Sequence, residues 1–114
     1  MLRTNLKHIE TADEFKKLVE SGEKLAVVCG RMGPMCIPVY GVMESLESKY
    51  PDINFRDMDF DTNVAIQTIR ALPEVKNFAG LPFTVYFKDG KVVAATSSIQ
   101  NKQQVKEIID SRLV

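Results

Sequence analysis

The sequence predicts an α/β fold with three layers (α/β/α) and a central sheet of mixed parallel and antiparallel strands. Strand-like and helix-like segments alternate along most of the chain, and a strand–helix–strand unit needs a crossover that leaves its strands parallel. Asp89-Gly90 stands between two apolar runs, the pattern of a tight hairpin, which adds antiparallel strands. Residues 25–29 are apolar throughout, as expected of a strand that helices cover on both faces.

The first strand and the first helix can be read from residues 6–22. Residues 6–9 are expected to form a short strand. Thr11 followed by Glu14 matches a helix capping box, and apolar residues then recur at the i, i+3, i+4 spacing of an amphipathic helix: Phe15, Leu18 and Val19. Gly22 is expected to end this helix.

A second helix follows the apolar strand after a turn rich in glycine and proline. Pro38 is suited to the first helical position, so regular helix is expected to begin near it, with Cys36 just before or within the first turn. The helix is expected to continue to Tyr50. Its apolar stripe consists of Val39, Val42, Met43 and Leu46.

The remaining elements complete the order β-α-β-α-β-α-β-β-α. Residues 53–61 are expected to form a strand, and Asp61 or Thr62 to cap a helix running to about Leu72. The buried side of that helix is predicted to be Ala65, Ile66, Ile69 and Leu72, with a loop over 74–79. After the hairpin, residues 101–104 are expected to cap a last helix that buries Val105, Ile108, Ile109 and Leu113.

Length and charge limit the classes of function. A chain of 114 residues is expected to form one domain, residues 1–114. Its formal net charge of zero gives no basic field to hold nucleic acid or an anionic membrane. No apolar run has the length of a signal peptide or a membrane span. A cytoplasmic location is therefore expected, where thiols are free or only transiently oxidised.

The two cysteines lie at the two ends of one strand–turn–helix junction. Cys29 ends the apolar strand and Cys36 precedes the helix, so the pair is a candidate dithiol that closes a short loop. A thiol at a helix N-terminus ionises more easily than a free cysteine, which favours Cys36 as the thiolate. The alternative is structural: Cys29 is a small core residue and Cys36 is a lone, partly exposed thiol.

Residues 27–38 resemble the active-site segment of the thioredoxin family, in which an apolar strand leads into Trp-Cys-Gly-Pro-Cys and a helix. Gly80-Leu81-Pro82, followed by a strand and the Asp89-Gly90 turn, resembles that family's Gly-Ile-Pro-Thr segment. The resemblance covers nearly the whole chain. It implies a thioredoxin-like fold, a cis bond between Leu81 and Pro82, and thiol–disulfide exchange.

The two-cysteine motif of that family is not intact in this sequence. In one register Gly33-Pro34-Met35-Cys36 occupies the Cys-x-x-Cys positions, and only the second cysteine is kept. In the other register Met32-Gly33-Pro34-Met35 occupies them and both are lost. The chain has no tryptophan, Val27 or Ala26 replaces the family's buried acid, and Phe83 replaces the threonine after the proline.

Two functions follow from this resemblance. The first is an atypical thioredoxin that exchanges disulfides with a protein or low-molecular-weight disulfide, with a disulfide reductase as a further partner. Cys36 would attack and Cys29 would resolve, or the roles would be reversed. The substrate-binding residues would be Met32, Gly33, Pro34, Met35, Leu81 and Pro82. The second is a redox-inactive, thioredoxin-fold module that binds a protein.

No cofactor or metal is expected. Residues 57–61 open like a calcium loop, but Thr62 and Thr68 stand where that loop needs glycine and glutamate. His8 is the only histidine and is distant in sequence from both cysteines. Asp57 and Asp59 lie on a predicted strand and are the nearest candidates for an internal base, but a hydrogen-bonded or solvated role is expected.

Overall fold

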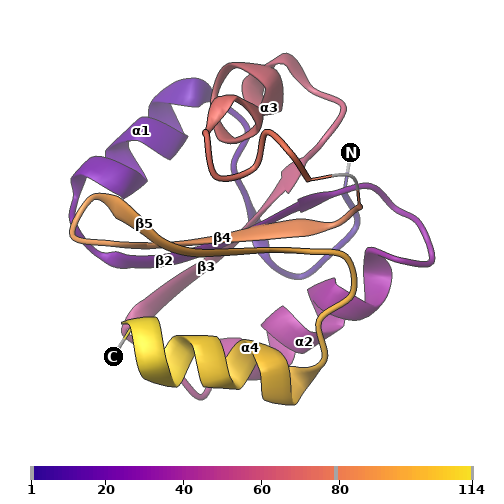
Figure 1. Ribbon diagram of the computed structural model, residues 1–114, viewed down its shortest axis with the longest axis vertical. Helices are drawn as coiled ribbons and strands as arrows, with labels where there is room; N and C mark the ends of the chain where they lie inside the picture. Colours follow the sequence, from indigo (N-terminus) through magenta and orange to yellow (C-terminus); the bar gives the residue numbers. More distant parts are fainter. Residues whose placement is uncertain (1, 79, 114) are drawn as a thin grey trace.

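The computed structural model describes residues 2–78 and 80–113, and its elements follow the predicted order (Figure 1). The strands are β1 (Lys7–His8), β2 (Lys24–Gly30), β3 (Ile53–Asp59), β4 (Phe83–Lys88) and β5 (Lys91–Ser97). The helices are α1 (Ala12–Glu20), α2 (Ile37–Glu47), α3 (Asn63–Gln67) and α4 (Lys102–Ile108). A 3-10 turn (Ile69–Ala71) follows α3, and a π-helical segment (Ile109–Leu113) extends α4.

The five strands form one mixed sheet in the order β1-β3-β2-β4-β5. β3 pairs in parallel with β1 and β2, whereas β4 pairs antiparallel with β2 and β5. Figure 1 shows α1 and α3 on one face of the sheet and α2 and α4 on the other. The three-layer class with a mixed sheet is thus confirmed. No helix of the described residues has the length and apolar character to cross a membrane.

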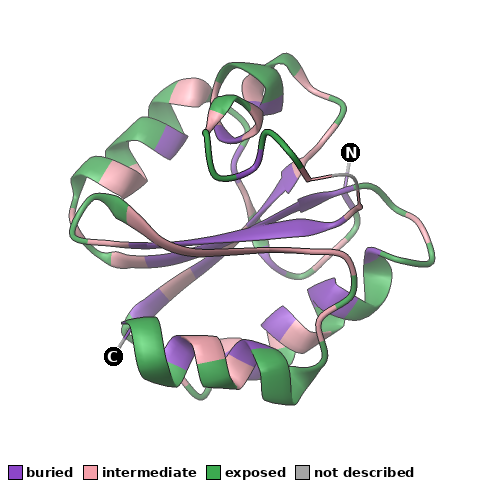
Figure 2. Cartoon of the chain, in the orientation of Figure 1, coloured by how far each residue is buried: buried purple, intermediate pink, exposed green. Residues whose placement is uncertain are grey.

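β2 is buried over most of its length (Figure 2), and its side chains alternate between two hydrophobic clusters, one on each face of the sheet. Ala26 and Val28 pack with residues of α2 and α4. Leu25, Val27 and Cys29 pack on the opposite face with residues of α1 and α3. Residues 25–30 are all buried, so this apolar run is a central strand covered on both sides.

The predicted helix caps and hairpin form with one difference. The Thr11 hydroxyl accepts a hydrogen bond from the backbone N–H of Glu14 at 3.1 Å. The Glu14 carboxylate, however, accepts from the backbone N–H of Glu10 and the hydroxyl of Thr11 rather than from the backbone N–H of Thr11, so the box is not closed. Gly22 follows α1 with a φ of 76°. The full capping box is found at the start of α4, between Asn101 and Gln104. Asp89 and Gly90 both have positive φ, which the hairpin turn requires.

Two helices end earlier than the sequence predicts. α2 ends at Glu47, and the N–H groups of Lys49 and Tyr50 close a turn onto Leu46 beyond it. The helix predicted to reach Leu72 breaks at Thr68, where φ is −119° and ψ is −93°. The Thr68 hydroxyl donates to the carbonyl of Val64 at 2.6 Å, a local bond that competes with regular helix.

The early break also corrects the predicted buried face of that helix. Ala65 and Ile69 are fully buried as expected, and Leu72 is partly buried. Ile66, expected on the same side, is 52% exposed. A helix of five residues presents little more than one turn, and the backbone turns away before a continuous stripe can form.

Candidate functional site

The site begins where β2 ends, α2 starts and β4 begins. Cys36 is the N-cap residue of α2, and Pro38 lies in the first turn, so the predicted start of the helix is confirmed. The N–H groups of Cys36 and Ile37 both donate to the carbonyl of Gly33 at 3.0 Å, which holds the loop in a tight turn before the helix. The peptide bond between Leu81 and Pro82 is cis, as the resemblance implies.

The Cys36 thiol lies over Gly30 and beside Tyr40. A Cβ placed on Gly30 would be 2.8 Å from both Cys36 Sγ and the Tyr40 hydroxyl, and 3.0 Å from Pro82 Cβ. Only a glycine therefore leaves room for these three side chains. The backbone N–H of Arg31 donates to Cys36 Sγ at 3.4 Å, so the sulfur has a polar donor although the residue is only 3% exposed.

Tyr40 fixes the other side of this thiol pocket. Its hydroxyl donates to the carbonyl of Arg31 at 2.9 Å. Burial raises the pKa of Tyr40, so the phenol stays protonated and remains a donor. Arg31 is thus bonded through its N–H to Cys36 and through its carbonyl to Tyr40, which ties the start of the loop to α2.

Cys29 lies on the opposite face of β2 from Cys36. It is fully buried, and its strand neighbours are Met58 and Phe83. Burial raises the pKa of the Cys29 thiol, an effect that the charge of Arg70 partly offsets. Both cysteines are free thiols, and their side chains belong to hydrophobic clusters on opposite faces of the sheet. A Cys29–Cys36 dithiol stays a prediction from the sequence.

Most of the predicted substrate-binding residues lie around one shallow groove at Cys36. The groove has a volume of about 420 Å³ and is lined by Arg31, Gly33, Pro34, Met35, Cys36, Gly80, Leu81 and Ser98. Two of the predicted residues lie outside this lining. Pro82 is buried against Gly30, and Met32 is 40% exposed, with its sulfur accepting from the backbone N–H of Arg3.

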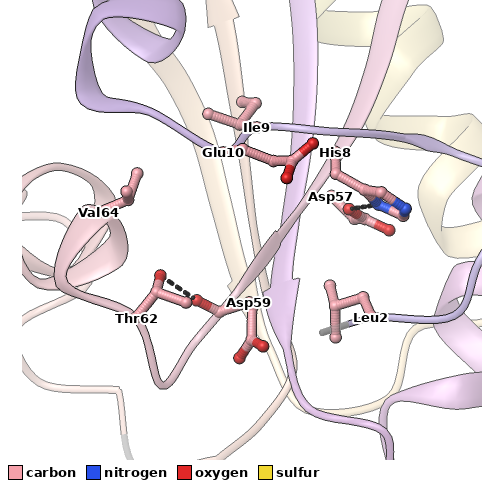
Figure 3. Close-up of a pocket in the computed structure, with 8 residues that line it drawn as sticks. All are labelled: Leu2, His8, Ile9, Glu10, Asp57, Asp59, Thr62 and Val64. Atoms are coloured by element: carbon pink, nitrogen blue, oxygen red, sulfur yellow. Dashed lines mark hydrogen bonds and ion pairs between the residues drawn. The ribbon is translucent and has the colours of Figure 1, made fainter.

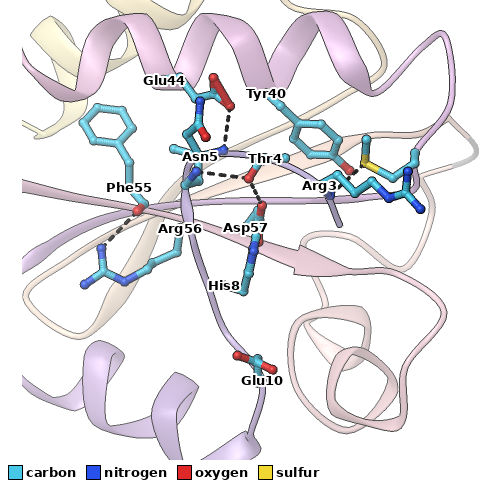
Figure 4. Close-up of polar contacts among 12 residues, drawn as sticks. Arg3, Thr4, Asn5, His8, Glu10, Tyr40, Glu44, Phe55, Arg56 and Asp57 are labelled. Atoms are coloured by element: carbon cyan, nitrogen blue, oxygen red, sulfur yellow. Dashed lines mark hydrogen bonds and ion pairs between the residues drawn. The ribbon is translucent and has the colours of Figure 1, made fainter. Parts of the chain in front are cut away.

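A second polar site, which sequence reasoning did not single out, lies at the edge of the sheet. The Asp57 carboxylate is fully buried; it accepts a hydrogen bond from the Thr4 hydroxyl and lies 2.5 Å from His8 Nδ1 (Figure 4). Burial raises the pKa of Asp57, and the bonds to Thr4 and His8 partly offset this. The hydrogen-bonded role expected for Asp57 is confirmed.

His8 and Asp57 also line a cavity of about 220 Å³ between β1, β3 and the start of α3 (Figure 3). Glu10, Asp59 and Thr62 lie around the same cavity. Within residues 2–78 and 80–113, no three histidine, cysteine or acidic side chains are grouped to hold a metal ion. The sequence signal for this network was weak, because Thr4 and His8 are about fifty positions from their partner.

Comparison with solved structures identifies the fold as that of thioredoxin. The chain is similar to mitochondrial thioredoxin 3 of Saccharomyces cerevisiae, with a TM-score of 0.73 and 22% identity over 92% of this chain and 94% of that one. It is similar to thioredoxin of Malassezia sympodialis, with a TM-score of 0.76 and 15% identity over 100% and 96%.

Thioredoxin of Fasciola hepatica gives a TM-score of 0.72 and 24% identity over 94% of this chain and 99% of that one. No protein-family model matches the sequence, and no curated protein matches it significantly. At these identities the likeness identifies the fold, and function has to be argued from the site.

Proposed function

Starting from a thioredoxin fold, we propose that the chain performs thiol–disulfide exchange with a protein or small-molecule disulfide, and that Cys36 is the attacking thiol. The observation that supports this best is the place of Cys36: it caps α2, receives the N–H of Arg31 at 3.4 Å and borders an open groove. Backbone donors and a helix N-terminus stabilise a developing thiolate.

The proposed step is an exchange of one disulfide for another. The Cys36 thiolate attacks one sulfur of the substrate disulfide, a bond forms between Cys36 Sγ and that sulfur, and the substrate's S–S bond breaks. The second substrate sulfur leaves with the electron pair and takes up a proton. Because Cys36 is only 3% exposed, the attack requires the groups around its sulfur to move aside.

The mixed disulfide then has to be resolved by a second thiol. Cys29 is the internal candidate, but its position on the other face of β2 favours a thiol from another molecule. Resolution by Cys29 would require the end of β2 to rotate, and this would break its pairing with Met58 and Phe83.

The experiment is a thiol count by alkylation and mass spectrometry after equilibration across glutathione redox buffers. We expect a glutathione adduct on Cys36 alone in the wild-type protein and in Cys29→Ser, and no adduct in Cys36→Ser. A reversible Cys29–Cys36 disulfide with a potential between roughly −300 and −180 mV would instead support the internal dithiol. If both thiols stay free in every buffer, the exchange proposal is wrong.

A protein-binding module is the second candidate, and exposed apolar side chains favour it. Met35 and Ile37 are each 48% exposed and Ile99 is 45% exposed; Met35 lines the groove, Ile37 is the first residue of α2, and Ile99 follows Ser98 of the groove. In the register that keeps Cys36, Gly33 also takes the position of the first cysteine of the motif, so no thiol is present there. In an insulin-reduction assay with dithiothreitol, a module would give no acceleration, and the Cys29→Ser/Cys36→Ser double variant would match wild type.

A further inference from the structure

A basic cavity adjoins the Cys36 groove on the side of α3. Its volume is about 380 Å³, within the range of cavities that hold small ligands. It lies between the 3-10 turn after α3 and the start of β4. Its wall carries the cationic side chains of Arg31, Arg70 and Lys76 together with aromatic rings, among them that of Phe60.

The cations of this cavity are not all neutralised by the protein. Arg31 forms a two-point ion pair with Asp61, with N–O distances of 2.7 and 2.9 Å. Arg70 stacks 3.9 Å from the centroid of the Phe60 ring and donates to the Phe60 carbonyl at 3.3 Å. In the part of the chain that the structure describes, no carboxylate forms a direct ion pair with Arg70 or Lys76. The hydrogen bond from Arg31 lowers the pKa of Asp61, and Asp61 is near enough to Arg70 for that charge to help lower it.

Two guanidinium groups therefore share one aromatic ring, since Arg31 also lies 5.2 Å from the Phe60 centroid. Cation–π contacts hold such groups in place. Asp61 already neutralises Arg31. Arg70 and Lys76 therefore carry the charge of the cavity that an anion would pair with, and that anion would meet a guanidinium group that is already oriented. Guanidinium groups bind carboxylates with two parallel hydrogen bonds where geometry allows.

The cavity lies beside the groove at Cys36, and Arg31, Gly80 and Leu81 line both. A ligand anchored by its carboxylate on the basic side would therefore reach toward Cys36 past Leu81. To react with Cys36 from this position, a carboxylate ligand needs a sulfur atom a few bonds from its carboxylate.

We propose that this cavity binds the carboxylate end of a small thiol or disulfide of the size of glutathione, and presents its sulfur to Cys36. The inference rests on the proposed function for the identity of the sulfur ligand. It also supplies the resolving thiol. Cys29 lies on the other face of β2, so this thiol has to come from another molecule. When Cys36 is joined to a substrate in a mixed disulfide, the bound thiolate attacks the substrate sulfur. A ligand–substrate S–S bond forms, the bond between that sulfur and Cys36 Sγ breaks, and Cys36 leaves as the thiolate.

Binding is tested first with a probe that cannot exchange. S-methylglutathione is titrated into the wild-type protein by calorimetry, and its diethyl ester serves as the probe without carboxylate charges. We expect S-methylglutathione to bind with a Kd on the order of 1 mM or tighter. The ester should bind much more weakly, and added salt should weaken the binding of the acid.

Charge variants locate the site. Lys76→Glu and Arg70→Gln should each weaken the binding of S-methylglutathione by about tenfold or more. This is the loss of affinity expected when a charge-assisted hydrogen bond is removed. Lys91→Glu, the same change of charge at the β4–β5 turn, is the matched control and should bind like wild type. Lys76 is exposed, so Lys76→Glu tests the cavity even if Arg70→Gln fails to fold.

Three results would overturn the inference: no binding to the wild-type protein, equal binding of acid and ester, or equal weakening by Lys76→Glu and Lys91→Glu. A second measurement separates it from the proposed function. If S-methylglutathione binds as expected while glutathione disulfide leaves Cys36 unmodified, the cavity is supported and thiol exchange is refuted. If Cys36 is modified equally fast by glutathione disulfide and by cationic cystamine, exchange is supported and the carboxylate site is refuted.

Discussion

Gly30→Ala should destabilise the protein by about 2 kcal/mol, because the added methyl group has no room above β2. The new Cβ would lie 2.8 Å from Cys36 Sγ and 2.8 Å from the Tyr40 hydroxyl, whereas comfortable heavy-atom contacts are about 3.5–4.0 Å. Tyr40 cannot withdraw freely, since its hydroxyl donates to Arg31 at 2.9 Å. On the third side Pro82 Cβ is only 3.0 Å away.

The measurement is the free energy of unfolding from urea denaturation, compared with Gly41→Ala. Gly41 is exposed within α2 and has no atom within 4 Å of its added Cβ, so alanine there should stabilise by roughly 0.5–1 kcal/mol. Gly30→Ala should also speed alkylation of Cys36, because relief of the clash moves the thiol outward. A Gly30→Ala variant within about 0.5 kcal/mol of wild type and with unchanged Cys36 reactivity would refute this account of the thiol pocket.

Three further predictions concern the thiols and the buried carboxylate. Iodoacetamide should modify Cys36 in the folded protein but Cys29 only after denaturation, because burial raises the pKa of Cys29; equal rates measured by mass spectrometry would contradict this. Gly33→Cys has open space for its side chain and should create a thiol that forms a disulfide with Cys36 in oxidising glutathione buffer; a free-thiol count showing no loss would contradict the assigned loop. Burial raises the pKa of Asp57 in the folded state, so its contribution is full below the unfolded pKa of about 3.9 and is lost as the pH rises through the folded value. Asp57→Asn should remove that decline from the pH dependence of the urea midpoint, and an unchanged profile would contradict it.

The sequence predicted the architecture well because its signals are local. The apolar run at 25–29, the Asp89-Gly90 turn and the proline near the start of α2 each act over a few residues. The order of elements and the mixed sheet follow from them together with the rules for chain crossovers. The cis bond at Leu81–Pro82 came from resemblance alone, since isolated X–Pro bonds are mostly trans.

The site was harder to predict because it depends on which face of a strand a residue occupies. Cys29 and Cys36 are neighbours in sequence at one junction, but strand residues alternate with a period of two. Gly30, rather than Cys29, therefore faces Cys36. The basic cavity likewise brings Arg31, which follows β2, next to Arg70 and Lys76 from the segment after α3. No short-range sequence pattern connects these residues.

The break at Thr68 shows a different limit. Residues 62–72 carry a good helical pattern, yet the Thr68 hydroxyl bonds to the Val64 carbonyl and to Met58 Sδ of β3. The bond to β3 is a tertiary contact that helix propensity does not include. α3 ends at Gln67, just before Thr68, and Ile66 is left at the surface.

The N-terminal segment links regions that are far apart in sequence, and this sets where the molecule opens first. Leu2 and Leu6 are buried against the α2 side, the Asn5 N–H bonds to Glu44, and Thr4 and His8 cover the Asp57 carboxylate (Figure 4). When this segment detaches, water hydrates Asp57 and recovers the solvation lost on burial, which lowers the free energy of opening. Amide hydrogens of residues 6–9 should therefore exchange before those of β2, and each opening also frees Met32 from its bond with Arg3 and removes a contact of the loop that leads to Cys36.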